Sequence, residues 1–194
     1  MNPQLAPELL LAAYSRGIFP MAEEEGRIMW FCPDPRAIIE LDALRVSKTL
    51  AQLYRQGRFE LTVNRDFIAI ITACADRPEG TWISQDFIEA YGRLHELGYA
   101  HSIEAWRQGE LAGGLYGVAI GGVFCGESMF FRQRDASKIA LVYLVERMNE
   151  RGFELLDVQF TTDHLARMGA VEIPREEYFR RLAAAVRKPC RFAD

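Results

Sequence analysis

The chain has 194 residues, of which 49% are hydrophobic and 26% are charged, and its formal net charge is −4. This length and composition permit one globular domain, or one domain with a small appendage, that buries a sizeable core. The negative charge argues against a protein that binds nucleic acid over its whole surface, but it leaves open the recognition of a short single-stranded end.

Three further features indicate a cytoplasmic protein. No apolar run approaches the roughly 20 residues that a membrane-spanning helix needs. The N-terminus lacks the basic segment that precedes the apolar part of a secretory signal. The four cysteines, at positions 32, 74, 125 and 190, form no CxxC pair and show no metal-binding spacing with the three histidines. We therefore expect reduced thiols and no metal site.

The first predicted elements belong to a small N-terminal domain, residues 1–34. A helix is expected over Pro7–Arg16, with a proline suited to its first turn and Gly17 at its end. Two short apolar segments, Ile18–Met21 and Met29–Phe31, bracket an acidic loop at residues 23–25. Because long periodic segments begin only after this region, we place the domain boundary near residue 35.

The second domain, residues 35–194, alternates between strand and helix patterns. The expected elements in chain order are a strand at Ala37–Glu40, a helix at Ser47–Gln56, a strand at Phe59–Val63, helices at Asp66–Ala75 and Ser84–Leu97, strands at Ala100–Arg107, Glu110–Val118 and Gly122–Glu127, a helix at Ser137–Glu150, a strand at Phe153–Phe160, a short helix near Asp163–Met168 and a helix at Arg175–Arg187. This order predicts an α+β fold with a mostly antiparallel sheet.

The segment Gly121–Leu141 has the pattern of a binding site. An apolar strand loses its alternation at Gly126, which suggests a bulge, and the acidic Glu127 follows in apolar surroundings. A carboxylate in such a setting is costly without a partner or a function. Farther on, Ser137 is expected to cap a helix and, with Lys138, to offer a phosphate site, although a plain capped helix is an equal alternative.

A second polar feature lies in the predicted strand LLDVQF. Alternation places Asp157 and Gln159 on one face, opposite the apolar Leu156 and Val158. Such a pair could orient a substrate amine, and the alternative is an aspartate that only hydrogen-bonds a neighbouring strand or helix end. A nucleophilic role for Cys125 is rejected, because a cysteine within an apolar strand is usually inert.

Eight short runs of this sequence, in the same order, resemble one family, the leucyl/phenylalanyl-tRNA–protein transferases. They are GIFPM at Gly17–Met21, WFCPDPR at Trp30–Arg36, EGTWI at Glu79–Ile83, HELGYAHSIEAW at His95–Trp106, GGLYGVA at Gly113–Ala119, FCGESMF at Phe124–Phe130, ASKIAL at Ala136–Leu141 and DVQ at Asp157–Gln159.

The resemblance implies a bacterial, cytoplasmic aminoacyltransferase on an acetyltransferase-like (GNAT-like) domain. Such an enzyme moves Leu, Phe or Met from the 3′ end of an aminoacyl-tRNA to the N-terminal α-amino group of proteins that begin with Arg or Lys, in the N-degron pathway of degradation. An ester becomes an amide, so the reaction needs no cofactor, and it suits a monomer.

The resemblance also implies roles for individual residues. Asp157 and Gln159 would orient the amine, with Asp157 either a general base or only a positioning group. Glu127 would bind the cationic side chain of the acceptor or the ribose of the terminal adenosine. Trp82 is a candidate platform for the terminal adenine or for the aminoacyl group, and a buried core tryptophan is the alternative. Met21 stands where the family often has a tryptophan, which weakens an adenine contact there.

The side chain of the transferred amino acid requires an apolar pocket, which discriminates only weakly between similar side chains. Residues that match the family's pocket positions, with ordinary core as their alternative, are Leu115, Phe124, Gly126, Met129, Leu141, Leu144 and Leu156. Ser128, in the same run as Gly126 and Met129, is also expected to contact substrate.

Two other functions remain as alternatives. The first is a CoA-dependent N-acetyltransferase, which needs a glycine-rich turn for the pyrophosphate, whereas the corresponding segment here, RQRDASK, has no glycine. The second is a non-catalytic module that binds the end of tRNA, which would not need Asp157 and Gln159 on a shared polar face.

Overall fold

The structure is a computed structural model that describes residues 2–23, 26–78 and 80–193. Residues 24 and 25 of the predicted acidic loop, and Glu79 of the EGTWI run, lie outside the described residues. Within the described ranges, no helix is both long enough and apolar enough to cross a membrane.

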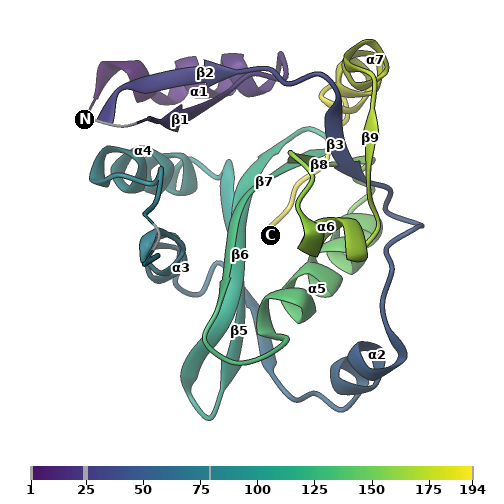
Figure 1. Cartoon of the computed structure of the whole chain (residues 1–194). Helices are drawn as coiled ribbons and strands as arrows, with labels where there is room; N and C mark the ends of the chain where they lie inside the picture. Colours follow the sequence, from purple (N-terminus) through teal and green to yellow (C-terminus); the bar gives the residue numbers. More distant parts are fainter. Residues whose placement is uncertain (1, 24–25, 79, 194) are drawn as a thin grey trace.

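A twisted seven-stranded sheet forms the centre of the fold, in the order β4-β5-β6-β7-β8-β3-β9 (Figure 1). Its strands are β3 (Arg36–Ile39), β4 (Glu60–Val63), β5 (Ala100–Arg107), β6 (Glu110–Ile120), β7 (Val123–Phe131), β8 (Leu155–Gln159) and β9 (Ala170–Ile173). All neighbouring strands are antiparallel except β7 and β8, which are parallel. The predicted α+β class with a mostly antiparallel, mixed sheet is therefore confirmed.

Helices cover both faces of this sheet and bury two hydrophobic clusters. The helices are α1 (Pro7–Tyr14), α2 (Lys48–Arg55), α3 (Phe67–Ala75), α4 (Gln85–Glu96), α5 (Ala136–Glu150), α6 (Asp163–Arg167) and α7 (Arg175–Ala185). Helices α1, α3, α4 and α7 contribute to the cluster on one face, and α2 and α5 to the cluster on the other (Figure 1). Helix α5 connects the parallel strands β7 and β8, as a parallel pair requires.

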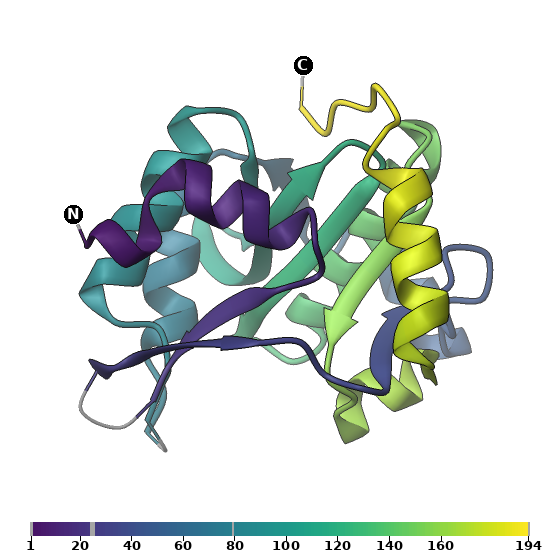
Figure 2. The same cartoon turned by 90° about the horizontal axis from the view of Figure 1, so that it is seen from above.

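The N-terminal segment adds a helix and a two-stranded hairpin beside the sheet. Strands β1 (Phe19–Ala22) and β2 (Ile28–Phe31) pair with each other and not with the main sheet, and α1 packs against α4 (Figure 2). Gly17 joins α1 to β1 with a φ of +76°, and a Cβ there would lie 2.7 Å from the Tyr178 ring. Only glycine allows both this conformation and this close approach.

Several predicted boundaries differ from the structure. Ser137 does not cap α5: the cap is Asp135, in a left-handed conformation (φ 69°), and Ser137 is buried inside the helix. The cap prediction is wrong because one left-handed residue starts the helix two residues earlier. Strand β7 continues to Phe131, past the predicted end at Glu127. The edge strand β9 was not predicted, since it is short and has two exposed residues.

Candidate active site

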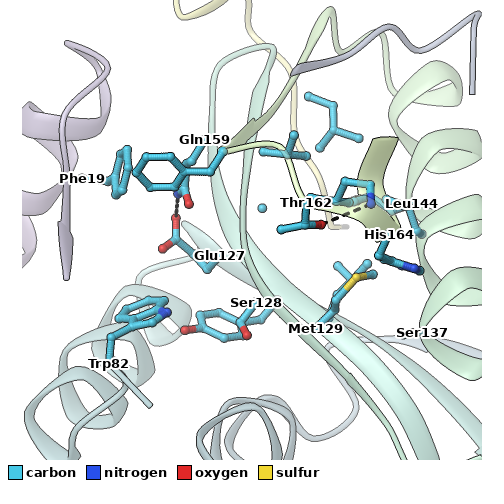
Figure 3. Close-up of a pocket in the computed structure, with 18 of the residues that line it drawn as sticks. Phe19, Trp82, Glu127, Ser128, Met129, Ser137, Leu144, Gln159, Thr162 and His164 are labelled. Atoms are coloured by element: carbon cyan, nitrogen blue, oxygen red, sulfur yellow. Dashed lines mark hydrogen bonds between the residues drawn. The ribbon is translucent and has the colours of Figure 1, made fainter. Parts of the chain in front are cut away.

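A cavity of about 410 Å³ opens where β7 and β8 diverge, between the sheet and helices α5 and α6. We call it the main cavity. Its apolar walls come from Leu115, Met129, Leu141, Leu144, Leu156 and Val158. Figure 3 shows Gln159, Glu127 and Trp82 on one side of this space and Leu144 and His164 on the other. An apolar space with a few polar groups at one end is the usual form of a small-ligand site.

Most of the predicted site residues line the main cavity. They are Met21, Trp82, Leu115, Gly126, Glu127, Ser128, Met129, Ser137, Leu141, Leu144, Leu156 and Gln159. Three predicted residues, Asp157, Phe124 and Lys138, are not among those that line it.

Phe124 and Lys138 are occupied elsewhere in the fold. The Phe124 ring is fully buried and lies 4.9 Å from the Phe192 ring, centroid to centroid, because its position on β7 faces the core beside the C-terminal segment. The Lys138 ammonium forms an ion pair of 2.9 Å with Asp135, the cap of its own helix. Phe124 therefore does not line the main cavity, contrary to the expectation from the sequence, whereas Lys138 does lie at the start of its helix but is paired with Asp135.

The polar end of the cavity arises from the divergence of β7 and β8. The parallel ladder between them ends at the pair Cys125–Asp157. Beyond it, Tyr116 pairs with Ser128 and Gly117 with Gly126, so Glu127 is the extra residue of a bulge, and the predicted bulge is confirmed.

The bulge brings Glu127 to Gln159. Gln159 has a φ of +66°, which interrupts the alternation of β8 at its last residue. Its amide Nε2 donates a hydrogen bond of 2.9 Å to Glu127 Oε1 across the gap between the strands (Figure 3). Two polar groups thus meet at the end of an apolar cavity.

Asp157 lies on the other face of β8. Leu156 and Val158 face the cavity, so alternation turns Asp157 away from it, and its carboxylate has no exposed surface. Oδ1 accepts hydrogen bonds from Arg36 Nε (2.8 Å) and from the Gln159 backbone N–H (2.9 Å). Oδ2 accepts from an Arg36 terminal nitrogen (2.6 Å) and from the Tyr178 hydroxyl (2.7 Å).

Arg36 supports Gln159 through Asp157, and the sequence did not predict this role. It is 1% exposed, donates a hydrogen bond of 2.9 Å to the Gly17 carbonyl and lies between the rings of Phe19 and Tyr178. Burial lowers its pKa, but the hydrogen bonds and charge of Asp157 outweigh this effect and raise it. The sequence carried one signal: a charged residue immediately before the apolar strand residues 37–39.

Two buried tyrosines next to Glu127 were also not predicted from the sequence. The Tyr91 hydroxyl donates to Glu127 Oε2 at 3.3 Å, and Tyr91 and Tyr14 share a short hydrogen bond. Burial raises the pKa of Glu127 from its ordinary value of 4.5 to about 8, and the charge of Asp157 contributes to the increase. Glu127 is therefore largely protonated at neutral pH and titrates in the range where amines do.

Arg77 fixes the outer half of β7 and was not predicted either. It lines the main cavity and donates hydrogen bonds to the Ser128 hydroxyl (2.9 Å) and the Met129 carbonyl (3.2 Å).

The surroundings of Cys125 oppose nucleophilic chemistry, since burial and the charge of Asp157 raise the pKa of its thiol. In the part of the chain that the structure describes, no group of three or more His, Cys, Asp or Glu residues could hold a metal ion.

Comparisons with known proteins show the family of the chain. Residues 38–183 match the family model "Leucyl/phenylalanyl-tRNA protein transferase", and residues 3–34 match the model of that family's N-terminal domain. The chain belongs to the leucyl/phenylalanyl-tRNA–protein transferase family. The resemblance inferred from the eight sequence runs is thereby confirmed, and the chain is an aminoacyltransferase.

Relatives in this family match the chain over almost its whole length. Leucyl/phenylalanyl-tRNA–protein transferases of Gloeobacter violaceus and Rubrobacter xylanophilus are 56% and 57% identical to it. The alignments cover 97% and 98% of this chain and 97% and 100% of those proteins, respectively. Among solved structures, "The structure of L-PGS from Bacillus licheniformis" superposes with a TM-score of 0.43 at 16% identity, over 82% of this chain and 55% of that one.

Proposed function

We propose that this enzyme transfers leucine, phenylalanine or methionine from the 3′ end of an aminoacyl-tRNA to the N-terminal α-amino group of an acceptor protein. The observation that carries the proposal is the Gln159–Glu127 pair at the end of an apolar cavity. Membership of a family named for leucyl and phenylalanyl groups on tRNA supports it.

In this proposal the side chain of the amino acid enters between Met129, Leu144 and Leu156, and the ester carbonyl lies at Gln159. The hydrogen bond from Gln159 Nε2 to Glu127 fixes the amide, so that Gln159 Oε1 remains as an acceptor for an N–H of the incoming amine. Positioning the amine against the ester carbonyl supplies a large part of the rate enhancement in such a reaction.

In its ionised form, which is the minor form at neutral pH, Glu127 accepts the first proton that the acceptor ammonium loses. An N-terminal ammonium has a pKa of about 7.7–8.0, close to the value of about 8 for Glu127, so proton transfer between them costs little free energy. The neutral amine nitrogen then bonds to the ester carbon and the carbon–oxygen bond to the ribose breaks. A second proton of the nitrogen passes to the leaving ribose oxygen, and Glu127 releases the first proton to water. No covalent enzyme intermediate or cofactor is required.

Asp157 acts as a positioning residue in this scheme. Its carboxylate accepts the backbone N–H of Gln159, and Arg36 and Tyr178 hold the carboxylate in place. A carboxylate with four hydrogen bonds and no exposed surface cannot reach an amine in the cavity. Of the two roles that the sequence left open for Asp157, we therefore favour the positioning role.

The terminal adenosine is proposed to lie against Trp82 and Met21, at the edge of the main cavity. Stacking on an aromatic ring stabilises a bound base by about 1–3 kcal/mol. Ser128, which also lines the cavity, is proposed to contact the ribose. Lys138 is not needed for phosphate binding in this arrangement, because it is paired with Asp135.

The acceptor is proposed to begin with Arg or Lys. Among the described residues that line the main cavity, Glu127 is the only acidic one, so its ionised form is the candidate partner for the α-ammonium of any acceptor. The preference for Arg or Lys is proposed from the family resemblance. We further propose that the enzyme works as a cytoplasmic monomer in the N-degron pathway, and that residues 1–34 and 35–194 form its two domains.

A transfer assay tests this function. The enzyme is mixed with leucyl-tRNA that carries labelled leucine and with peptides that differ only in an N-terminal Arg, Lys or Ala. Transfer to the Arg and Lys peptides, with little to the Ala peptide, is expected. No transfer to any peptide would contradict the proposal, and equal transfer to all three would contradict only the acceptor preference. Acyl transfer from acetyl-CoA alone would favour the N-acetyltransferase alternative.

A further inference from the structure

A second cavity lies next to the main one, on the other side of Trp82 and Arg77. It is lined by Ala22, Glu23, Arg77, Gly80, Thr81 and Trp82 and has a volume of about 320 Å³. Arg77 and Trp82 line both cavities, so a ligand that occupied both would lie close to these two side chains.

Arg77 is well placed to meet an anion at this junction. Its Nε donates to the Cys74 carbonyl at 3.1 Å, and one terminal nitrogen donates to Ser128 and Met129. These acceptors are neutral, and the side chain forms no ion pair with any residue that the structure describes. Among the described residues, none compensates the positive charge of the exposed Arg77 side chain, and its hydrogen bonds fix its orientation. Such a guanidinium is a favourable partner for a phosphate group.

Among the described residues that line the second cavity, Glu23 is the acidic one, and it does not cancel this charge. Glu23 forms an ion pair of 2.9 Å with Arg27, and so its negative charge is already compensated. The other lining groups are small or neutral, and Trp82 offers an aromatic surface that a base can approach.

We propose that Arg77 binds the phosphodiester that joins the terminal adenosine of the tRNA to the preceding nucleotide, and that the second cavity receives that nucleotide. The assignment rests on the proposed function, which places the adenosine in the main cavity. The phosphate leaves the 5′ side of that adenosine, and Arg77 is the cation shared by both cavities. The enzyme then reads two nucleotides of the single-stranded end.

Three donors test the proposal, since each adds one group to the previous one: leucyl-adenosine, leucyl-adenosine with a 5′-phosphate, and leucyl-CpA. For the unmodified enzyme, kcat/KM should rise about ten-fold when the phosphate is added, as expected for a charge-assisted hydrogen bond. It should rise further when the cytidine is added. In Arg77→Gln the gain from the phosphate should disappear, and Arg77→Lys should restore part of it.

Ratios between donors separate this role from a structural one. If Arg77→Gln disturbs β7, the disturbance lowers kcat/KM for all three donors alike. The ratio of kcat/KM between two donors then stays unchanged. Arg93→Gln, on the exposed face of α4, is the control and should keep the full gain. Arg77→Gln should also lower the salt dependence of leucyl-CpA use by about 0.7 in the slope of log affinity against log salt, the value for one contact to a single strand.

Two results would overturn the proposal. One is an equal phosphate gain in Arg77→Gln and in the unmodified enzyme. The other is a phosphate gain of less than two-fold in the unmodified enzyme. Leucyl-adenosine itself reports on the proposed function, because transfer from it requires the main cavity but not the phosphate. An experiment in which the proposed function fails can therefore be told apart from one in which only the phosphate contact of Arg77 fails.

Discussion

Arg36 holds Asp157 through two parallel N–H···O bonds, of 2.8 and 2.6 Å, between residues that are 121 positions apart in the chain. Arg36 is the first residue of β3, and Asp157 lies on β8, two residues before Gln159. The same guanidinium donates to the Gly17 carbonyl next to α1. One buried ion pair thus joins the N-terminal segment, the sheet and the backbone of the proposed catalytic residue.

Replacing Arg36 by methionine should destabilise the protein strongly. The variant leaves Asp157 buried without its cation, and breaking a buried pair in this way costs about 3–5 kcal/mol. Urea denaturation followed by circular dichroism measures the change. Arg65→Met, which breaks an exposed pair with Glu60, is the control and should cost less than about 1 kcal/mol. A cost for Arg36→Met as small as that of the control would show that the pair does not hold the fold.

Asp157→Asn separates the two roles considered for this residue. The asparagine keeps an acceptor for the Gln159 N–H but loses the charge that Arg36 binds. We expect a less stable protein whose folded fraction transfers leucine within about five-fold of the unmodified enzyme in single-turnover experiments. If Asp157 were a general base, the folded variant would lose about 10²–10⁴-fold. A loss in that range, at a temperature where the variant is folded, would contradict the positioning role.

Glu127 should make the stability of the protein depend on pH. Its folded-state pKa of about 8 lies above the value of about 4.3 in the unfolded chain. Between these values the folded state holds a proton that the unfolded state has lost. The free energy of unfolding therefore falls as pH rises, by at most about 1.4 kcal/mol per pH unit.

Glu127→Gln removes this titration. Denaturation curves for both proteins between pH 5 and pH 9 should show the unmodified protein losing stability relative to the variant across this range. The relative loss should stop above about pH 8, where the folded state has also released the proton. If the free energies of unfolding of the two proteins changed with pH in parallel, burial would not raise the pKa of Glu127.

The walls of the main cavity should set the preference between leucine and phenylalanine. Met129→Ala enlarges the cavity, and we expect the ratio of phenylalanyl to leucyl transfer to rise about ten-fold, within the range for small changes in an apolar pocket. Phe124→Leu, at a buried position outside the cavity, should lower stability and leave the ratio unchanged. Competition between phenylalanyl-tRNA and leucyl-tRNA measures the transfer ratio. If the unmodified enzyme, Met129→Ala and Phe124→Leu all gave the same ratio, this cavity would be excluded as the side-chain pocket.

Trp82 should contribute to tRNA binding without taking part in bond formation. Trp82→Ala is expected to weaken binding of a leucyl-adenosine analogue by about 5- to 150-fold, the equivalent of about 1–3 kcal/mol of stacking. Trp82→Phe should retain most of the affinity, because it keeps an aromatic ring. Trp106→Phe, on β5 outside the cavity lining, is the control. Unchanged binding in Trp82→Ala would place the adenine elsewhere.

The sequence predicted the local features of the site more accurately than its long-range contacts. Periodicity located the strands and helices, and the glycine at position 126 marked the bulge that presents Glu127. These features depend on a few neighbouring residues, which a single sequence displays. The start of α5 was missed because an aspartate took a left-handed conformation that its sequence context does not announce.

Contacts between distant segments could not be read from the pattern. Alternation correctly put Asp157 on the face opposite Leu156, but it could not tell which face the cavity would occupy. That depends on where α5 and α6 pack. The partners Arg36 and Tyr178 approach Asp157 from β3 and α7, and no local rule connects these elements to β8.

The central claim is that Glu127, held by Gln159 at the end of the apolar cavity, accepts the proton of the acceptor amine. Single-turnover transfer of leucine to an N-terminal Arg peptide, measured from pH 6 to pH 9, tests it most directly. The unmodified enzyme should accelerate with pH and level off above about pH 8. Glu127→Gln should be at least about 10²-fold slower at pH 7.5. A Glu127→Gln enzyme with the same rate and pH profile as the unmodified one would contradict the claim.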